Sequence, residues 1–229
     1  MWNVKAEYDA ILFDAGGVFV IPDPAVLAPT LAYYGATLDH DQYHRAHYGA
    51  MAAKSRAQVT EDDWSHYNRR YIELVGVHPD EHDSAVFVLS RTRHAHLWRA
   101  PIRGSSDVLR ALNQRDTPIG VVSNASGQIA EILRRSGICQ VGEGPLPQVR
   151  CIVDSDVVGI AKPDPRIFDF ALPHFADIDT SRIAYVGDSV VMDVGGAQAA
   201  GLTPILVDPY DDAVDLVDCQ RIRSLEELL

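Results

Sequence analysis

The chain has 229 residues, of which 47% are hydrophobic and 23% are charged, and its formal net charge at pH 7 is −12. This is ordinary globular composition, so disordered and fibrous classes are disfavoured, and the length suits one large domain or a core with a small insertion. The negative charge argues against binding to nucleic acid, which needs a basic surface, and against binding to anionic membranes.

The three cysteines, Cys139, Cys151 and Cys219, form an odd and scattered set. They predict neither a disulfide framework nor a metal site with paired ligands. There is no run of about eighteen apolar residues that could cross a membrane, and the N-terminus lacks the layout of a signal peptide. We therefore expect a cytoplasmic location.

The first predicted strand is the mostly apolar run at residues 8–13, which leads into Asp14-Ala15-Gly16-Gly17. A short apolar run followed by glycines is typical of a buried strand that ends in a tight loop. Four further runs of this kind are predicted as strands, at residues 118–122, 150–153, 182–186 and 204–207.

Residues 23–100, after the first strand, have a different pattern. They are rich in Tyr, His, Arg and Ala, and periodic apolar residues such as Tyr67, Tyr71 and Leu74 favour helices over strands. We predict an all-helical insertion between the first strand and the rest of the chain.

Helical stretches separate the later strands, at residues 105–114, 127–136, 165–174 and 193–200. Asp164 is the expected N-cap of the third helix, with Pro165 in its first position, and Gly201 is the expected C-cap of the fourth. Strands that alternate with helices predict an α/β fold with a Rossmann-like parallel sheet and helices on both faces. In such sheets the reactive groups gather at the carboxyl ends of strands.

Asp14 comes directly after the first predicted strand. The glycines behind it let backbone amides approach an anion, and a carboxylate in this position can act as a nucleophile and as a magnesium ligand. Aspartate is also a common turn former, so Asp14 alone does not decide between these interpretations.

Three later segments carry further polar groups. Ser123-Asn124 ends the second predicted strand and could hold phosphoryl oxygens, although Ser-Asn is also ordinary turn chemistry. Lys162, on a loop fixed by two prolines, can neutralise a carboxylate and a phosphate together, and the alternative is a solvated lysine. Asp188 and Asp193 follow the fourth strand and could bind Mg²⁺, while Asp193 could instead be an N-cap.

Taken in order, these segments resemble the four motifs of the haloacid dehalogenase-like hydrolase superfamily. The matching segments are Phe13-Asp14-Ala15-Gly16-Gly17-Val18, Val122-Ser123-Asn124, Ala161-Lys162-Pro163-Asp164-Pro165, and Val186-Gly187-Asp188-Ser189 through Asp193-Val194-Gly195-Gly196-Ala197. The resemblance covers essentially the whole chain, because the insertion falls where this family carries its first type of cap domain. It implies a core domain of residues 1–22 and 101–229 and a helical cap of residues 23–100.

The resemblance also implies a role for each matched residue. Asp14 would be the nucleophile, and Mg²⁺ would be bound by Asp14, by the backbone carbonyl of Gly16 and by Asp188. Asp193 would anchor Lys162 or a metal-bound water.

The phosphate would lie against a second set of groups. Lys162 would stabilise charge on the nucleophile and on the phosphate. The amides of Ala15 and Gly16, the hydroxyl of Ser123 and the amide of Asn124 would hold the phosphoryl oxygens. Such preorganised groups act most strongly where charge builds on the transferring phosphoryl group.

Gly16 departs from the pattern of the family's phosphatases. These usually carry a second aspartate two residues after the nucleophile, and loss of such an acid–base group costs about 10²–10⁴-fold in rate. A histidine of the insertion could replace it. The candidates are His44, His47, His66, His94 and His96.

Other activities remain open beside a phosphatase. The family's 2-haloacid dehalogenases also lack the second aspartate, but they use no magnesium and their last motif differs from Gly187-Asp188-Ser189. Phosphonate hydrolases need a cap lysine, and Lys54, the only lysine of the insertion, is more simply explained as solvated. A non-catalytic protein that binds a metal and a phosphate ester is the third possibility.

We therefore expect a Mg²⁺-dependent hydrolase, acting as a phosphatase on a small phosphorylated metabolite through an aspartyl-phosphate at Asp14. The expected partner is this small molecule, with neither nucleic acid nor membrane involved. Arg45, Arg56 or Arg91 could meet a second anionic group of a substrate, although solvated arginines are the simpler interpretation.

Overall fold

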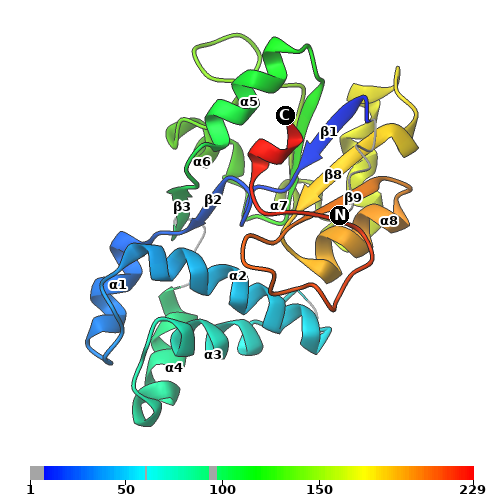
Figure 1. Cartoon of the computed structure of the whole chain (residues 1–229). Helices are drawn as coiled ribbons and strands as arrows, with labels where there is room; N and C mark the ends of the chain where they lie inside the picture. The colour runs from blue at the N-terminus through cyan, green and yellow to red at the C-terminus, as the bar shows by residue number, and fades with distance from the viewer. Residues whose placement is uncertain (1–7, 60, 93–96) are drawn as a thin grey trace.

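The computed structural model describes residues 8–59, 61–92 and 97–229. Its centre is a six-stranded parallel sheet with the strand order β10-β9-β8-β1-β4-β7 (Figure 1). The strands of this sheet are β1 Ala10–Phe13, β4 Ile119–Ser123, β7 Ile152–Asp154, β8 Ile183–Gly187, β9 Thr203–Val207 and β10 Gln220–Ile222. The predicted α/β fold is confirmed, and all five predicted strands belong to this sheet.

Helices cover both faces of the sheet. Successive side chains of a strand point to opposite faces, and alternate residues of β1 belong to two separate hydrophobic clusters. One cluster includes apolar residues of α5 (Ser105–Gln114) and α6 (Ile129–Arg135), and the other includes residues of α8 (Gly195–Ala199). The central strands β1, β4 and β8 are buried along their whole length, as expected for a parallel sheet covered on both sides.

The helices of the core follow the prediction in part. Helix α5 has the predicted bounds, and α6 lies inside its predicted range. The predicted helix at 165–174 is instead a pair of 3-10 segments, Pro165–Phe170 and Leu172–Phe175. Pro173 explains this break, because it has no N–H to donate and its ring clashes with the carbonyl four residues earlier. Asp164 is the N-cap as predicted, and its carboxylate accepts from Arg166 N at 3.0 Å.

The segment after β8 also differs from the prediction. A π-helical turn, Val190–Val194, precedes the short helix α8, and Ser189 caps this turn by accepting from Met192 N. Asp193 therefore lies inside the turn, and its interpretation as an N-cap is wrong.

The insertion between β1 and β4 is helical, with its own hydrophobic cluster. Its helices are α1 Pro24–Ala32, α2 His40–Ala57, α3 Ser65–Leu74 and α4 His82–Thr92. Strands β2 (Val20–Pro22) and β3 (Trp98–Pro101) pair antiparallel where the insertion leaves and rejoins the core. The expectation that no strand occurs in 23–100 is thus wrong at the last residues, while the exact domain limits stay a prediction.

Helix α2 packs against the core rather than extending away from it. Asp39 caps its start by accepting from Asp41 N, and Gln58 ends it in the left-handed conformation. Arg45 forms a two-bond ion pair with Asp212, in which Arg45 Nη2 donates at 2.8 Å. This ion pair connects the insertion to the segment that follows β9.

Short elements complete the structure. They are β5 Gln140–Val141, β6 Gln148–Val149, α7 Ser155–Val158 and the 3-10 turns Pro79–Glu81, Thr180–Arg182 and Leu225–Leu228. Among the described residues, no helix is both long and apolar enough to span a membrane.

Candidate active site

The predicted site residues meet at the carboxyl edge of the sheet. Asp14 follows β1, Ser123 ends β4 and Asp188 follows β8, and these three strands are neighbours. The parallel register brings their ends to the same level, with Phe13 opposite Val121 on one side and Val186 on the other.

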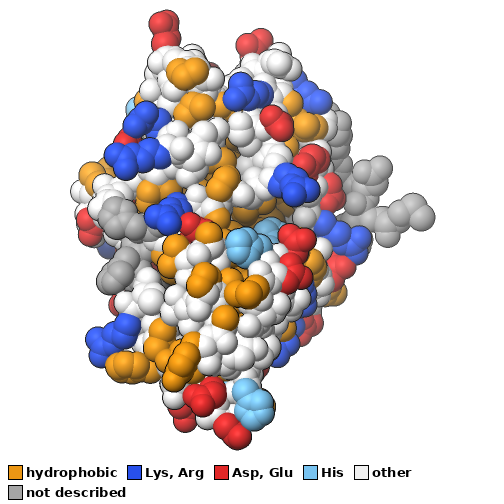
Figure 2. All heavy atoms as spheres, turned by 90° about the vertical axis from the view of Figure 1, so that its left-hand side faces the viewer, with side chains coloured by type: hydrophobic (Ala, Val, Ile, Leu, Met, Phe, Trp, Pro, Cys, Tyr) orange, Lys and Arg blue, Asp and Glu red, His pale blue; other side chains and the backbone are white. Residues whose placement is uncertain are grey.

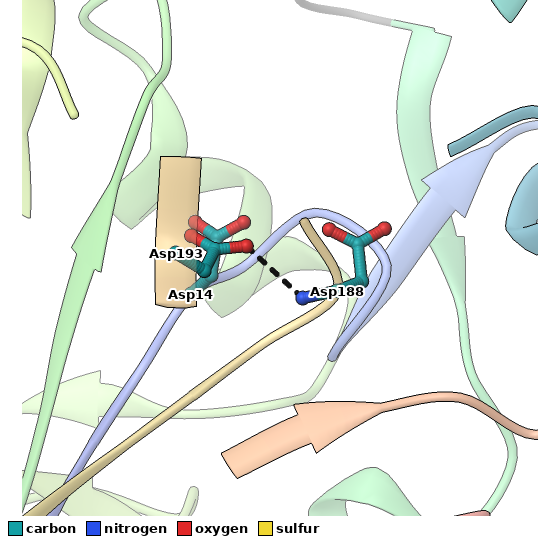
Figure 3. A group of neighbouring side chains, drawn as sticks. All are labelled: Asp14, Asp188 and Asp193. Carbon is teal, nitrogen blue, oxygen red and sulfur yellow. Dashed lines mark hydrogen bonds between the residues drawn. The ribbon is translucent and has the colours of Figure 1, made fainter. Parts of the chain in front are cut away.

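Three carboxylates lie together at this edge (Figure 3). Asp14, Asp188 and Asp193 each offer one oxygen, and the three oxygens lie within 4.8 Å of one another. All three residues are buried. Buried carboxylates at this spacing repel each other unless cations lie between them.

Lys162 is one such cation. Its Nζ lies 2.9 Å from Asp14 Oδ1 and donates to Asp193 Oδ1 at 2.6 Å and to the hydroxyl of Tyr185 at 2.7 Å. The Lys162 side chain is 2% exposed, so the interpretation of a solvated lysine is wrong. Tyr185 in turn donates to the carbonyl of Val122.

Asn124 fixes the main chain of Lys162. Its side-chain nitrogen donates to the Lys162 carbonyl at 3.0 Å, and its oxygen accepts from the Lys162 N–H at 2.8 Å. The Asn124 side chain is therefore occupied by this two-bond contact. The main-chain amide of Asn124 is the group of this residue that is left for a ligand. Ser123, beside it, is 2% exposed.

Asp193 is held in place through both of its oxygens. Oδ1 accepts from Lys162, and Oδ2 accepts from the main-chain amides of Asp188 at 3.0 Å and Ser189 at 2.8 Å. Figure 3 shows the bond from the Asp188 amide. Asp193 thus connects the lysine to the loop that carries Asp188.

The electrostatics of the site reflect an excess of negative charge. Burial raises the pKa of Asp14 to about 7, against the opposing effect of Lys162 and with a further contribution from Asp193. Burial and Asp193 likewise raise the pKa of Asp188 well above its ordinary value. Although burial opposes it, the charges of Asp14 and Asp193 raise the pKa of Lys162. One lysine is insufficient for three carboxylates, so a second cation would stabilise them.

The donor set fits a hard divalent cation. All three groups offer carboxylate oxygen, which Mg²⁺ and Ca²⁺ prefer. Asp14 Oδ1 is buried and accepts no hydrogen bond of good geometry, although Lys162 Nζ lies close to it, so this oxygen retains capacity for a cation. Gly17 keeps the loop close: a Cβ on this residue would lie 1.9 Å from Asp188 Oδ2, and its φ is +65°.

His47 of helix α2 reaches this site from the insertion. Its Nε2 lies 2.9 Å from Asp188 Oδ2 and its Nδ1 lies 2.9 Å from the hydroxyl of Tyr67, with the side chain fully buried. Its neighbour Tyr48 donates to the carbonyl of Gly17 at 2.8 Å. Both ring nitrogens of His47 are thus occupied by protein groups.

The other histidine candidates do not meet the carboxylates in the described part of the chain. His44 bonds to Tyr210, and His66 is exposed on α3. His94 and His96 lie outside the described residues.

The place beside Gly16 is filled by a tryptophan. A Cβ on Gly16 would lie 3.1 Å from Cζ3 and 3.3 Å from Cε3 of Trp98, on strand β3. The Trp98 ring also packs edge-on against His47, with ring centroids 5.4 Å apart. A side chain in position 16 would require this ring to shift by a few tenths of an ångström.

A cavity of about 390 Å³ opens between the core and the insertion at these groups. The four charged residues of the network line it together with Gly16, Ser123 and Asn124, and the insertion side contributes Met51, Glu61, Asp62, Trp64 and Trp98. Figure 2 shows hydrophobic side chains over the middle of one face, at the level where the insertion meets the core.

The remaining charged candidates of the insertion have other partners. Lys54 is 4% exposed, lies over the ring of Trp64 at 3.6 Å and donates to the carbonyl of Glu61, so the prediction of a solvated lysine is wrong here too. Arg45 and Arg56 pair with Asp212 and Asp215. None of the three lines the cavity.

Comparison with known proteins identifies the family. Residues 8–201 match the haloacid dehalogenase-like hydrolases, and the chain belongs to this family. It is 34% identical over 137 residues to haloacid dehalogenase-like hydrolase domain-containing protein 3 of Bos taurus. The matched region covers 58% of this chain and 51% of that protein.

A second relative has a named activity. The chain is 32% identical over 131 residues to the pyrimidine 5'-nucleotidase YjjG of Escherichia coli, covering 56% of this chain and 55% of that protein. The chain thus spans about half the length of these curated relatives. The solved structure of the putative HAD-hydrolase YfnB from Bacillus subtilis, bound to magnesium, matches over 97% of both chains with a TM-score of 0.58 and 23% identity, which shows the shared fold.

Proposed function

We propose that this protein is a Mg²⁺-dependent phosphatase that acts on small phosphate monoesters through Asp14. The observation that carries the proposal is the network in which Lys162 lies between Asp14 and Asp193 at the edge of the cavity. The pyrimidine 5'-nucleotidase activity named for the Escherichia coli relative favours a phosphate ester over a haloacid.

Asp14 is the proposed nucleophile. Its carboxylate oxygen would attack phosphorus, the bond from phosphorus to the ester oxygen would break, and an aspartyl-phosphate would form. Lys162 would stabilise charge on Asp14 and on the phosphoryl group, since its Nζ already lies 2.9 Å from the carboxylate. Asp193 and Tyr185 would hold Lys162 in this orientation.

The phosphoryl oxygens would lie against the loop after β1 and the end of β4. Among the described residues, the amides of Ala15 and Gly16 donate to no backbone carbonyl, so they are free to bind an anion. The hydroxyl of Ser123 and the amide of Asn124 would complete this set.

Mg²⁺ would be held by Asp14, Asp188 and the carbonyl of Gly16, with Asp193 acting directly or through a bound water. When bound, the ion supplies positive charge to the three carboxylates and to the phosphoryl group. The pairing of both Asp193 oxygens with protein donors favours the indirect role for this residue.

A screen of phosphorylated metabolites tests the proposal. Wild type should release phosphate in the presence of Mg²⁺ and lose this activity with a chelator, and Asp14→Asn should be inactive. Asp107→Asn is the matched control, because it removes one exposed carboxylate of α5 that does not line the cavity, and it should behave as wild type.

Three results would contradict the proposal. Phosphate release by Asp14→Asn at the wild-type rate would exclude Asp14 as the nucleophile. Release of chloride from 2-chloropropionate, with no phosphatase activity on any ester, would instead establish a dehalogenase. Binding of phosphate esters without turnover would establish a non-catalytic protein.

A further inference from the structure

The first motif of this chain leaves an acid–base group unassigned, and the structure limits where it can come from. Trp98 lies against Gly16, where the ring would be 3.1 Å from any added Cβ. Gly16 itself carries no carboxylate, so a protein group in this role has to come from another wall of the cavity.

Few titratable groups line that cavity. Among the described residues they are the Asp14, Lys162, Asp188 and Asp193 network and two carboxylates of the insertion, Glu61 and Asp62. No described histidine lines it, and His47, the histidine nearest to the network, uses both ring nitrogens in contacts with Asp188 and Tyr67.

We propose that Glu61 is the catalytic acid–base group, supplied by the insertion in place of the one that Gly16 cannot carry. The inference rests on the proposed phosphatase function. Glu61 lines the same cavity as Asp14 and is partly buried, whereas its neighbour Asp62 is exposed.

The surroundings of Glu61 hold it in place without removing it from the cavity. Lys54 donates to its main-chain carbonyl at 3.0 Å, and Lys54 Nζ lies 3.5 Å from Glu61 Oε2. The Glu61 side chain remains 33% exposed, so a substrate can reach it, while Lys54 Nζ is held over the ring of Trp64.

The electrostatics of Glu61 suit proton donation. Burial raises its pKa, Lys54 and Lys162 lower it, and Asp193 raises it again. The effects of Lys162 and Asp193 place Glu61 within electrostatic range of the network, and an acid with a raised pKa keeps its proton closer to neutral pH.

The two chemical steps balance with Glu61 in this role. As Asp14 bonds to phosphorus, the ester bond breaks and the Glu61 carboxyl gives its proton to the departing oxygen, which leaves as an alcohol. Glu61 then takes a proton from water while the water oxygen bonds to phosphorus. The bond to Asp14 breaks, inorganic phosphate leaves, and both carboxyl groups return to their starting states.

A leaving-group series tests this role with Glu61→Gln. An alkyl phosphate needs a proton on its leaving oxygen, so phosphorylation of Asp14 by this ester should slow by about 10²–10⁴-fold. Phosphorylation by p-nitrophenyl phosphate, whose leaving group departs as a stable anion, should slow by less than about tenfold. Breakdown of the aspartyl-phosphate should slow equally for both esters, which gives a burst of nitrophenolate followed by slow turnover.

Two variants serve as controls. Asp62→Asn removes the neighbouring carboxylate of the same cavity wall and should keep the wild-type dependence on the leaving group. Lys54→Met removes a cation that lowers the pKa of Glu61, so the pH dependence of phosphorylation by the alkyl ester should move to higher pH, while phosphorylation by p-nitrophenyl phosphate should change little.

The outcomes separate this inference from the proposed function. An equal loss in the rate of Asp14 phosphorylation with both esters in Glu61→Gln, or no loss with either, would overturn the assignment of Glu61 while leaving the phosphatase intact. If wild type forms no aspartyl-phosphate with any ester, the proposed function fails, and the assignment of Glu61 fails with it.

Discussion

Lys162 explains why so many carboxylates can be buried at one edge of the sheet. It contacts Asp14 and Asp193, and its main chain is fixed by Asn124 from the neighbouring strand end. A buried charge without a partner is costly, so the lysine and the carboxylates stabilise one another. The order of these residues in the chain was sufficient to predict that they meet, because parallel strands bring their carboxyl ends to one edge.

Residues contributed by the insertion could not be predicted in the same way. Trp98 and Glu61 give no local signal, and His47 was one of five histidine candidates with nothing in the sequence to separate them. Their positions depend on how the insertion packs on the core, which is a tertiary property. Tyr185 was predicted as a buried strand residue, and only its contact with Lys162 reveals its second role.

At Gly17 we predict that a single methyl group disrupts the site. Gly17→Ala should lower the free energy of unfolding by about 2–4 kcal/mol, because the backbone is left-handed there and the Cβ would overlap Asp188. The control is Gly195→Ala, where the nearest atom to a Cβ would be 3.8 Å away. Urea denaturation of both variants measures the difference, and equal stability of the two would contradict this account of the loop.

Helix α2 is the element that connects the insertion to the site. It contributes His47 beside Asp188, Tyr48 beside Gly17 and Arg45 beside Asp212. The Arg45–Asp212 pair is partly buried, at 30% and 20% side-chain exposure, and has two bonds. Such a pair contributes more to docking than an exposed one.

A double-mutant cycle tests this difference between ion pairs. Arg45→Met and Asp212→Asn should show a coupling energy of about 1 kcal/mol in the free energy of unfolding. The same cycle on Arg56 and Asp215, whose side chains are 47% and 68% exposed, should give a value near zero. A coupling as large for the exposed pair would show that solvent exposure does not distinguish them.

The elements of the core were more predictable than those of the insertion. Apolar runs identified five strands, and the amphipathic pattern of α5 gave its bounds. Strand β10 was missed because Gln220-Arg221-Ile222 has no apolar run, and it forms by pairing with β9 at the sheet edge. The helix predicted at 165–174 failed because the pattern gave too little weight to Pro173.

At the scale of the whole molecule, the core and the insertion have separate hydrophobic clusters, and residues of both line the cavity of the candidate active site. The raised pKa of Asp14 links the stability of this arrangement to pH. The ordinary pKa of an aspartate is 3.8, and that of Asp14 in the folded chain is about 7. At pH values between these two, the folded chain keeps a proton on Asp14 that the unfolded chain releases. This contribution to stability therefore falls as pH rises through that window.

Mg²⁺ should reverse this loss. With the ion about 100-fold above its dissociation constant at pH 8, the free energy of unfolding should rise by about 2.7 kcal/mol, or about 5–10 °C in Tm. Binding requires deprotonated ligands, so at pH 5.5 the affinity should be about 30-fold weaker, given a pKa of about 7 for Asp14. Thermal unfolding at both pH values measures this.

The variants define the outcome of the metal experiment. Asp107→Asn should show the same pH dependence as wild type, and Asp188→Asn should lose most of the Mg²⁺ effect. A Mg²⁺ effect on Tm that is the same at pH 5.5 and pH 8 would contradict binding at the buried carboxylates.

The central claim is that Asp14 becomes phosphorylated, and peptide mapping of the rapidly quenched enzyme tests it most directly. After mixing with acetyl phosphate and Mg²⁺, wild type should carry one phosphoryl group on the peptide that contains Asp14, and Asp14→Asn should carry none. A phosphoryl group on another residue, or phosphate release from wild type without any labelled peptide, would contradict the account.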